Sequence, residues 1–363
     1  MFGADFNPVV TDIKIDGEII KSIGKTDAEG LDFSGCNVLP GFIDIHIHGC
    51  NMADATDGNA DSALKMSKWL ATKGVTSFCP TTMTLSADFL KECFAYIGNS
   101  IGKEEGAYIH GINMEGPFIA PEKKGAQAAE HIIEPDYELF KELNDICPVK
   151  LVDIAPERKN AEEFIKKAKN ICTVSAAHTT ADYSTGKKAI ESGITHATHL
   201  YNAMNGLTSR EAGMVGAVLD SNNVNAELIC DGIHISPPTL RITFKALGED
   251  RTVVISDAMM AAGLEEGEYT LGGQKVIKTD AARLEDGTLA GSATNLFDEF
   301  KNLLSFGIPL RQAIKSVSIN PARAIGVDKT TGSIEEGKFA DMVVLSNDFS
   351  EIKAVFIKGK KVI

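Results

Sequence analysis

The chain has 363 residues, 44% of them hydrophobic, which is enough for one large domain and a small one. Its formal net charge of −14 argues against nucleic acid or an anionic membrane surface as a partner. Any anionic substrate must therefore be held by a local basic site.

Three features bear on where the protein works. Residues 1–10 show no basic region followed by an apolar core, so we expect no secretory signal. No apolar run approaches the ~18 residues of a membrane span. The seven cysteines are scattered without a CxxC pair, which is typical of free thiols in a reducing compartment. We therefore predict a cytoplasmic protein with no membrane partner.

Both ends of the chain have the pattern of short strands joined by turns. Residues 8–39 contain Asp16-Gly17, a strong hairpin signal. Residues 337–363 have the same character, with a turn expected at Lys358-Gly359-Lys360. Neither end is long enough to bury a face alone, so we expect them to pair into one small β-sandwich domain.

Strand-like and helix-like segments alternate between the two ends. The strand candidates are residues 41–48, 76–82, 108–116, 149–157, 173–179, 196–204, 225–232 and 252–259. Eight strands with intervening helices predict an α/β fold, a (β/α)8 TIM-like barrel. A doubly wound sheet is the alternative, but no GxGxxG follows the first strand.

The predicted domain boundaries follow from this alternation. Residues 1–39 and 331–363 form the two parts of the small β domain, and residues 40–330 form the catalytic barrel. Residues 267–292 have the pattern of a hairpin insertion after the eighth strand and before a helix.

Titratable side chains gather at the predicted carboxyl ends of the strands, where barrel enzymes place their catalytic groups. In "GFIDIHIH", alternation along a strand aims both histidines to one face and Ile45 and Ile47 to the other. Imidazoles and carboxylates are the ligand set of zinc or iron, so we expect a metal site. The strand-end residues are His46, His48, Glu115, His178, His199 and Asp257.

Several segments of the chain resemble the amidohydrolase superfamily, and more narrowly its N-acetylglucosamine-6-phosphate deacetylase branch. They are "GFIDIHIHG", "GINMEGPFIAPEKKGA", "VSAAHT", "THATHLYNAM", "ICDGIHISP", "VISDAMMAAG" and "NPARAIGVDKTTGSIEEGKFADMVVL". The combination of "MEGPF" and "THLYNAM" is specific to this branch, whereas the HxH pair indicates only the superfamily.

The resemblance implies Glu115, His178 and His199 as the core metal ligands. It leaves two readings of His46 and His48: they complete a second metal position, or they hydrogen-bond the first. One or two divalent cations, Zn²⁺ or Fe²⁺, are expected per chain.

The resemblance also implies a phosphosugar substrate and a homodimer. Arg210 matches the phosphate-binding arginine of the family, while Asn202, Ala203 and His234 match its substrate contacts. The chain departs from the family at Gln127, which replaces a histidine thought to contact the substrate. Glutamine forms hydrogen bonds but does not titrate.

The expected reaction is the metal-dependent hydrolysis of N-acetyl-D-glucosamine 6-phosphate to D-glucosamine 6-phosphate and acetate. A metal lowers the pKa of water, and Asp257 is placed as general base and then general acid. The alternatives are the N-acetylgalactosamine epimer, another N-acyl amidohydrolase, or an inactive sugar-phosphate sensor.

Overall fold

The computed structural model describes residues 1–27 and 29–363. Its centre is a parallel sheet in the order β14-β13-β12-β11-β10-β9-β7-β4, with β8 beside β7. The strands of this sheet are β4 (Phe42–Ile47), β7 (Val75–Thr82), β8 (Tyr108–Ile109), β9 (Ile112–Met114), β10 (Val149–Ile154), β11 (Thr173–Ala176), β12 (His196–Ala197), β13 (Asn225–Leu228) and β14 (Thr252–Val254). This arrangement confirms the predicted barrel.

The barrel is closed by the segment that follows β14 rather than by β14 itself. The backbone N–H of Asp257 donates to the carbonyl of His46 at 2.9 Å, and the carbonyl of Ala258 accepts from the N–H of His48 at 2.9 Å. Every residue of β4 and β7 is buried, as expected for parallel strands covered on both faces. The first and last strands therefore meet where the candidate metal ligands lie.

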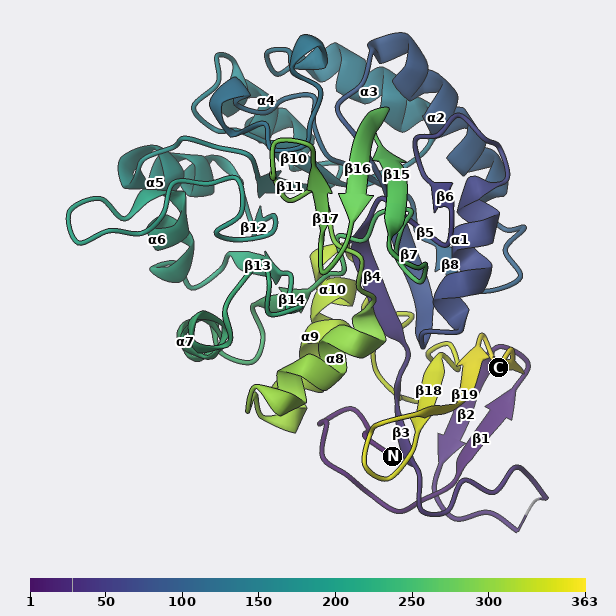
Figure 1. Cartoon of the computed structure of the whole chain (residues 1–363). Coiled ribbons are helices and arrows are strands. Elements are labelled where there is room, and N and C mark those ends of the chain that lie inside the picture. The colour runs from purple at the N-terminus through teal and green to yellow at the C-terminus, as the bar shows by residue number, and fades with distance from the viewer. Residues whose placement is uncertain (28) are drawn as a thin grey trace.

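Helices surround the sheet, as Figure 1 shows, and most of them connect successive strands. They are α1 (Ser62–Ala71), α2 (Ala87–Ser100), α3 (Tyr137–Ile146), α4 (Ala161–Ala168), α5 (Tyr183–Ser192), α6 (Gly213–Leu219), α7 (Pro237–Leu247), α8 (Leu296–Ser305), α9 (Leu310–Val317) and α10 (Ile319–Ala324), with short 3₁₀ turns at Pro121–Lys123 and Ala129–His131. No helix in the described part of the chain is long and apolar enough to cross a membrane.

The two ends of the chain meet in a small β domain, at the bottom of Figure 1. β3 (Asn37–Pro40) pairs with β18 (Met342–Leu345), which continues through β19 (Ile352–Ile357) to β20 (Lys360–Lys361). β1 (Ile13–Asp16) and β2 (Ile19–Ile23) form a second, two-stranded sheet. The predicted pairing of the termini is therefore confirmed, and we propose domain boundaries at 39/40 and 330/331.

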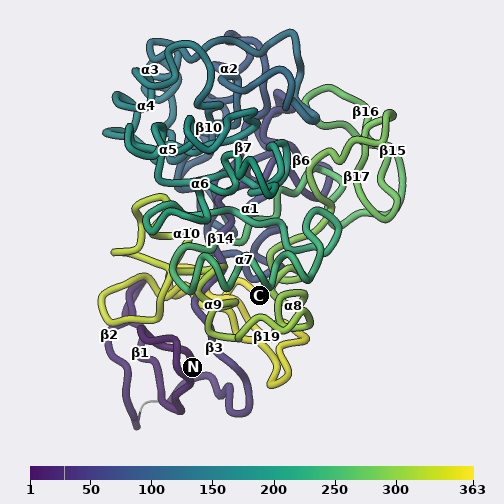
Figure 2. The backbone as a smooth tube through the Cα atoms, turned by 90° about the vertical axis from the view of Figure 1, so that its left-hand side faces the viewer, coloured from purple at the N-terminus to yellow at the C-terminus, as the bar shows by residue number. Residues whose placement is uncertain are grey.

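A three-stranded antiparallel sheet interrupts the chain after the barrel. It consists of β15 (Gly267–Leu271), β16 (Gln274–Lys278) and β17 (Ala282–Leu284), and Figure 2 shows it projecting from one side of the barrel. A short hairpin of β5 (Gly49–Cys50) and β6 (Ala53–Asp54) follows β4. All seven cysteines are free thiols.

Candidate metal centre

The carboxylate of Glu115, directly after β9, lies at the centre of the candidate site. Its Oε1 atom is 3.0 Å from Nε2 of His178 and 3.0 Å from Nε2 of His199, and these two nitrogens are 3.2 Å apart. Ligand atoms around a tetrahedral zinc ion with bonds of about 2.0–2.1 Å are separated by about 3.3 Å. The three donor atoms therefore have the spacing that a divalent cation requires.

A second group shares Glu115 and lies toward β4. Nε2 of His48 is 3.2 Å from Oε2 of Glu115, and Nε2 of His46 is 3.7 Å from its Oε1. Oδ1 of Asp257 lies 3.2 Å from Nε2 of His48 and 3.5 Å from Nε2 of His46. The structure thus brings all six strand-end residues together: five form two donor groups that share the Glu115 carboxylate, and Asp257 lies beside the second group.

Three polar atoms of this cluster are buried without a hydrogen bond. They are Nε2 of His46, Nδ1 of His199 and Oδ1 of Asp257, which find no hydrogen-bond partner among the described residues. A buried polar atom without a partner costs about 1–3 kcal/mol, so native proteins rarely keep one unless a ligand uses it. Nε2 of His46 and Oδ1 of Asp257 lie 3.5 Å apart beside His48, which fits a site built for a cation.

The backbone at the strand ends is bent into an unfavourable conformation. The φ angles are 43° at His178, 31° at His199 and 47° at Asp257, in the left-handed region that non-glycine residues avoid. Each such residue destabilises the folded state by about 1–3 kcal/mol, and residues of this kind cluster at functional sites. These bends end β11, β12 and β14 early and turn the three side chains toward the centre.

Backbone carbonyls hold two of the imidazoles on the side that points away from the centre. Nδ1 of His178 is 2.7 Å from the carbonyl oxygen of Lys123, and Nδ1 of His48 is 3.3 Å from that of Thr81. A carbonyl only accepts, so each Nδ1 carries a proton, and Nε2 is the nitrogen that would bind a cation at the centre.

His46 is held in the same way by a charged group. Its Nδ1 atom is 3.0 Å from Oε2 of Glu227 on β13, and Oε1 of Glu227 is 3.1 Å from Nε2 of His196. All three side chains are fully buried. Burial opposes the charge of Glu227, but His46 and His196 outweigh burial and lower its pKa to about 2. Glu227 is therefore an ionised acceptor for both rings.

The electrostatics of the cluster follow from carboxylates and imidazoles packed together. Burial raises the pKa of Glu115, yet hydrogen bonds to His178 and His199 bring the net pKa well below its usual value. Burial also works against a charged His48, but Asp257 and Glu115 raise its pKa to about 10. The negative charge concentrated here is the kind that a divalent cation compensates.

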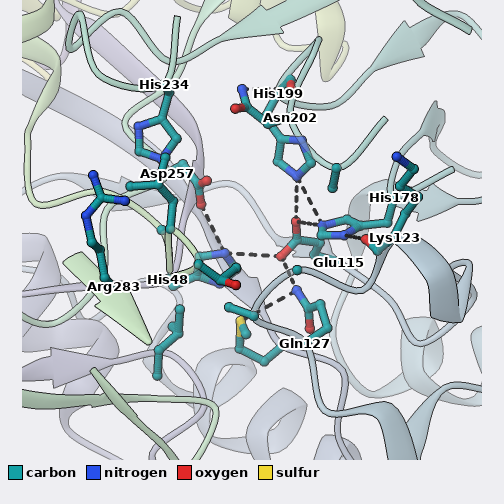
Figure 3. Close-up of a pocket in the computed structure, with 18 of the residues that line it drawn as sticks. His48, Glu115, Lys123, Gln127, His178, His199, Asn202, His234, Asp257 and Arg283 are labelled. Atoms are coloured by element: carbon teal, nitrogen blue, oxygen red, sulfur yellow. Dashed lines mark hydrogen bonds and ion pairs between the residues drawn. The ribbon is translucent and has the colours of Figure 1, made fainter. Parts of the chain in front are cut away.

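A pocket opens onto this cluster (Figure 3). Four of the predicted substrate-binding residues line it: Gln127, Asn202, Ala203 and His234. Nδ1 of His234 bonds Oδ2 of Asp231 at 2.7 Å, which fixes the ring against the pocket wall. Arg210 does not line the pocket and lies exposed on the loop before α6.

Comparison with known proteins agrees with this geometry. Residues 37–362 match the amidohydrolase family. The chain belongs to the amidohydrolase family. It is 37% identical over 327 residues to N-acetylglucosamine-6-phosphate deacetylase of Bacillus subtilis, covering 88% of this chain and 83% of the relative. It is 32% identical over 346 residues to N-acetylgalactosamine-6-phosphate deacetylase of Escherichia coli O157:H7, covering 93% and 89%.

Solved structures of amidohydrolases share the fold. N-acetylglucosamine-6-phosphate deacetylase from Pasteurella multocida superposes with a TM-score of 0.93 at 29% identity, over 99% of this chain and 97% of that one. The amidohydrolase family is metal-dependent, which agrees with the two donor groups around Glu115.

Sequence reasoning missed two residues of this amidohydrolase site. Glu227 lies inside the buried strand "NAELIC", where a glutamate among apolar neighbours was an available signal. Arg283 lines the pocket from β17, and nothing in its sequence neighbourhood marks it. His196 contacts Glu227 behind His46 and does not line the pocket.

Gln127 lines the pocket, as expected of a substrate contact, but it also hydrogen-bonds Glu115. Its Nε2 atom donates to Oε2 of Glu115 at 2.6 Å, while its Oε1 accepts from the backbone N–H of Thr84 at 2.6 Å. The side chain is thus fixed at both ends, and it holds the carboxylate that both donor groups share.

Proposed function

We propose that this amidohydrolase removes the acetyl group from N-acetyl-D-glucosamine 6-phosphate, giving D-glucosamine 6-phosphate and acetate. The observation that carries the proposal is Oδ1 of Asp257, which has no hydrogen bond among the described residues and lies 3.2 Å from Nε2 of His48, in the pocket that Glu115, His178 and His199 also line. Relatives at 32–37% identity that carry the name of an amino-sugar-phosphate deacetylase support the choice of substrate.

A divalent cation, when bound by these residues, supplies a Lewis acid that acidifies water and polarises the amide carbonyl. Burial raises the pKa of Asp257, but His46 and His48 outweigh it and keep the carboxylate ionised, ready to accept a proton. Asp257 takes that proton from the attacking water and passes it to the leaving nitrogen. The second transfer is required because an amine leaves poorly as an anion.

The remaining pocket residues orient the sugar. His234, which is held by Asp231, and the Asn202-Ala203 segment line the pocket around the candidate metal-binding side chains. Gln127 keeps Glu115 in one orientation through the Nε2 contact. We assign zinc or ferrous iron to the site, and the two donor groups around Glu115 support a capacity of two ions per chain.

The experiment measures acetate release by the metal-loaded protein from four substrates. They are N-acetylglucosamine 6-phosphate, N-acetylgalactosamine 6-phosphate, unphosphorylated N-acetylglucosamine and an N-acetyl amino acid. The highest kcat/KM is expected on the first. A higher value on the second substrate would identify the epimer, which the relative in Escherichia coli supports. Preference for the amino acid, or no acetate release at all, would overturn the proposal.

We also propose a homodimer in which Arg210 reaches the partner's pocket. Arg210 is exposed and outside the pocket of its own chain, and Leu207, Ile233 and Ile242 in this region are 53%, 42% and 65% exposed. Light scattering at micromolar concentration should give twice the mass of the chain, 38.8 kDa. A monomer that remains fully active would refute the partner contribution.

A further inference from the structure

We propose that Arg283 binds the substrate's phosphate within the same chain, a proposal that rests on the proposed phosphosugar substrate. Arg283 is the one arginine among the described residues that lines the pocket. Figure 3 draws it on the same side of the pocket as His234 and Asp257, across from Lys123 and His178.

The strand pattern of the insertion explains why this side chain faces the pocket. β17 pairs with β16, with Arg283 opposite Ile277. Its two neighbours, Ala282 and Leu284, pack into the apolar cluster that contains Met83 and Met259. Successive side chains of a strand point to opposite faces, so Arg283 is turned away from that cluster. The insertion thus presents one cation on its polar face.

The guanidinium of Arg283 is largely free to bind a ligand. No carboxylate oxygen of the described residues lies within 4.0 Å of it. Its one protein hydrogen bond is from Nη1 to the carbonyl oxygen of Gly287 at 3.1 Å. A guanidinium has five N–H donors in a fixed fork, so most of its donors remain for a ligand. Arg158, Arg311 and Arg323, by contrast, each pair with a carboxylate.

The same hydrogen bond holds Arg283 close to the pocket rim. Gly287 belongs to the turn that leads into Thr288 and Leu289, and all three residues line the pocket. An antiparallel bridge joins Arg283 to Leu289. The guanidinium of the half-buried Arg283 is therefore held against the segment that borders the pocket.

The charges of the pocket indicate an anionic ligand group at this position. The pocket contains the acidic side chains of Glu115, Glu122 and Asp257, so a phosphate dianion needs a cation to offset them. The amine of Lys123, which also lines the pocket, donates to the carbonyl of Met204 at 3.3 Å. A planar guanidinium forms two parallel hydrogen bonds with phosphate, a geometry that an ammonium does not offer.

The test compares Arg283→Gln and Arg283→Lys with the wild-type protein. For each, kcat/KM is measured on N-acetylglucosamine 6-phosphate and on unphosphorylated N-acetylglucosamine, and the inhibition constant of inorganic phosphate is measured alongside. Arg283→Gln should lose about 10- to 100-fold on the phosphorylated sugar and weaken phosphate inhibition similarly, with less than about threefold loss on the other sugar. Arg283→Lys keeps the charge without the fork, so it should lose less.

Arg241→Gln is the matched control, because Arg241 is exposed on α7 and does not line the pocket. Metal content and the thermal unfolding midpoint should equal those of the wild type in every variant. If the wild type is active and Arg283→Gln leaves kcat/KM unchanged, or lowers it equally on both sugars, this inference is overturned but the proposed function is not. A wild type inactive on the phosphosugar overturns the proposed function, and this inference with it.

Discussion

The two ends of the barrel bury similar groups and use them differently. At the end that faces the small domain, Asp341 is 3% exposed and accepts three hydrogen bonds, from the hydroxyls of Tyr108 and Thr331 and the backbone N–H of Lys358, at 2.7–2.8 Å. At the pocket end, Asp257 is 7% exposed, and its Oδ1 has no hydrogen bond in the described structure beyond ion-pair contacts of 3.2 and 3.5 Å with the imidazoles of His48 and His46. One carboxylate is saturated by the fold, and the other is left available for chemistry.

The histidines at the two ends also differ, in the pKa of the buried ring. Burial, with Lys150 and Lys358 nearby, lowers the pKa of His110 to about 3, so that ring is neutral. At the pocket end the carboxylates of Asp257 and Glu115 overcome burial and raise the pKa of His48 to about 10. A buried imidazole is therefore not informative by itself; the carboxylates around it distinguish a packing residue from a candidate ligand.

The largest effect on turnover is expected from Asp257→Asn. The amide cannot take the proton from water, so kcat should fall by about 100-fold or more. Acetate release gives the rate, and elemental analysis should show that the metal content is retained. A variant that keeps more than about a tenth of the wild-type kcat would exclude Asp257 as the proton-transfer group.

Replacing His46 and His48 together with alanine should reduce turnover less, by about tenfold, because Glu115, His178 and His199 still form a complete donor group. Elemental analysis after loading with excess zinc should give two equivalents for the wild type and one for the double variant. His110→Ala is the control, since its ring lies at the other end of the barrel and should not change the count. One equivalent in both proteins would contradict the two-metal reading.

Glu227→Gln should lower the affinity for the metal and change turnover only weakly. His46 and His196 contact different oxygens of Glu227, and glutamine replaces one of these oxygens with an NH2 donor. An NH2 group facing Nδ1 of His46 would favour a proton on its Nε2, the nitrogen that faces the candidate metal position. Affinity for the second metal equivalent should fall by about 10- to 100-fold, as measured by competition with a chelator.

Glu299→Gln is the matched control for that variant. Glu299 is also fully buried, but burial raises its pKa well above the usual value, so it is a neutral acid that glutamine resembles. Its contact to the backbone N–H of Cys230 needs only an acceptor oxygen. Equal metal affinity in the two variants would show that Glu227 does not position His46.

The smallest effect on turnover is expected at the opposite end of the barrel. Asp341→Ala leaves three donors without their acceptor, which should lower the free energy of unfolding by about 2–4 kcal/mol. The kcat of the folded variant should stay within about twofold of the wild type. Thermal unfolding and acetate release measure the two quantities, and a large loss of turnover in a folded variant would contradict the division between the two ends.

Local patterns in the sequence predicted much of the fold. The apolar runs and the turns at Asp16-Gly17 and Lys358-Gly359 depend on residues close in the chain, so the order of strands and helices was predictable. Strand lengths were not predictable. The sequence predicted one strand over residues 196–204, but β12 ends at Ala197. The left-handed backbone at His199, Tyr201 and Ala203 ends it, and bends of this kind leave no periodic signal.

The six strand-end residues could also be found from the sequence, because in a parallel barrel the carboxyl ends of the strands converge at one end. The groups around them required the tertiary structure. Glu227 reaches His46 across 181 residues of sequence, and only the closed barrel makes them neighbours. The folding of the insertion brings Arg283 to the pocket, while the loop before α6 holds Arg210 outside it. Residue type and local spacing determined which chemistry was available, and strand order, closure and loop direction decided which side chains meet.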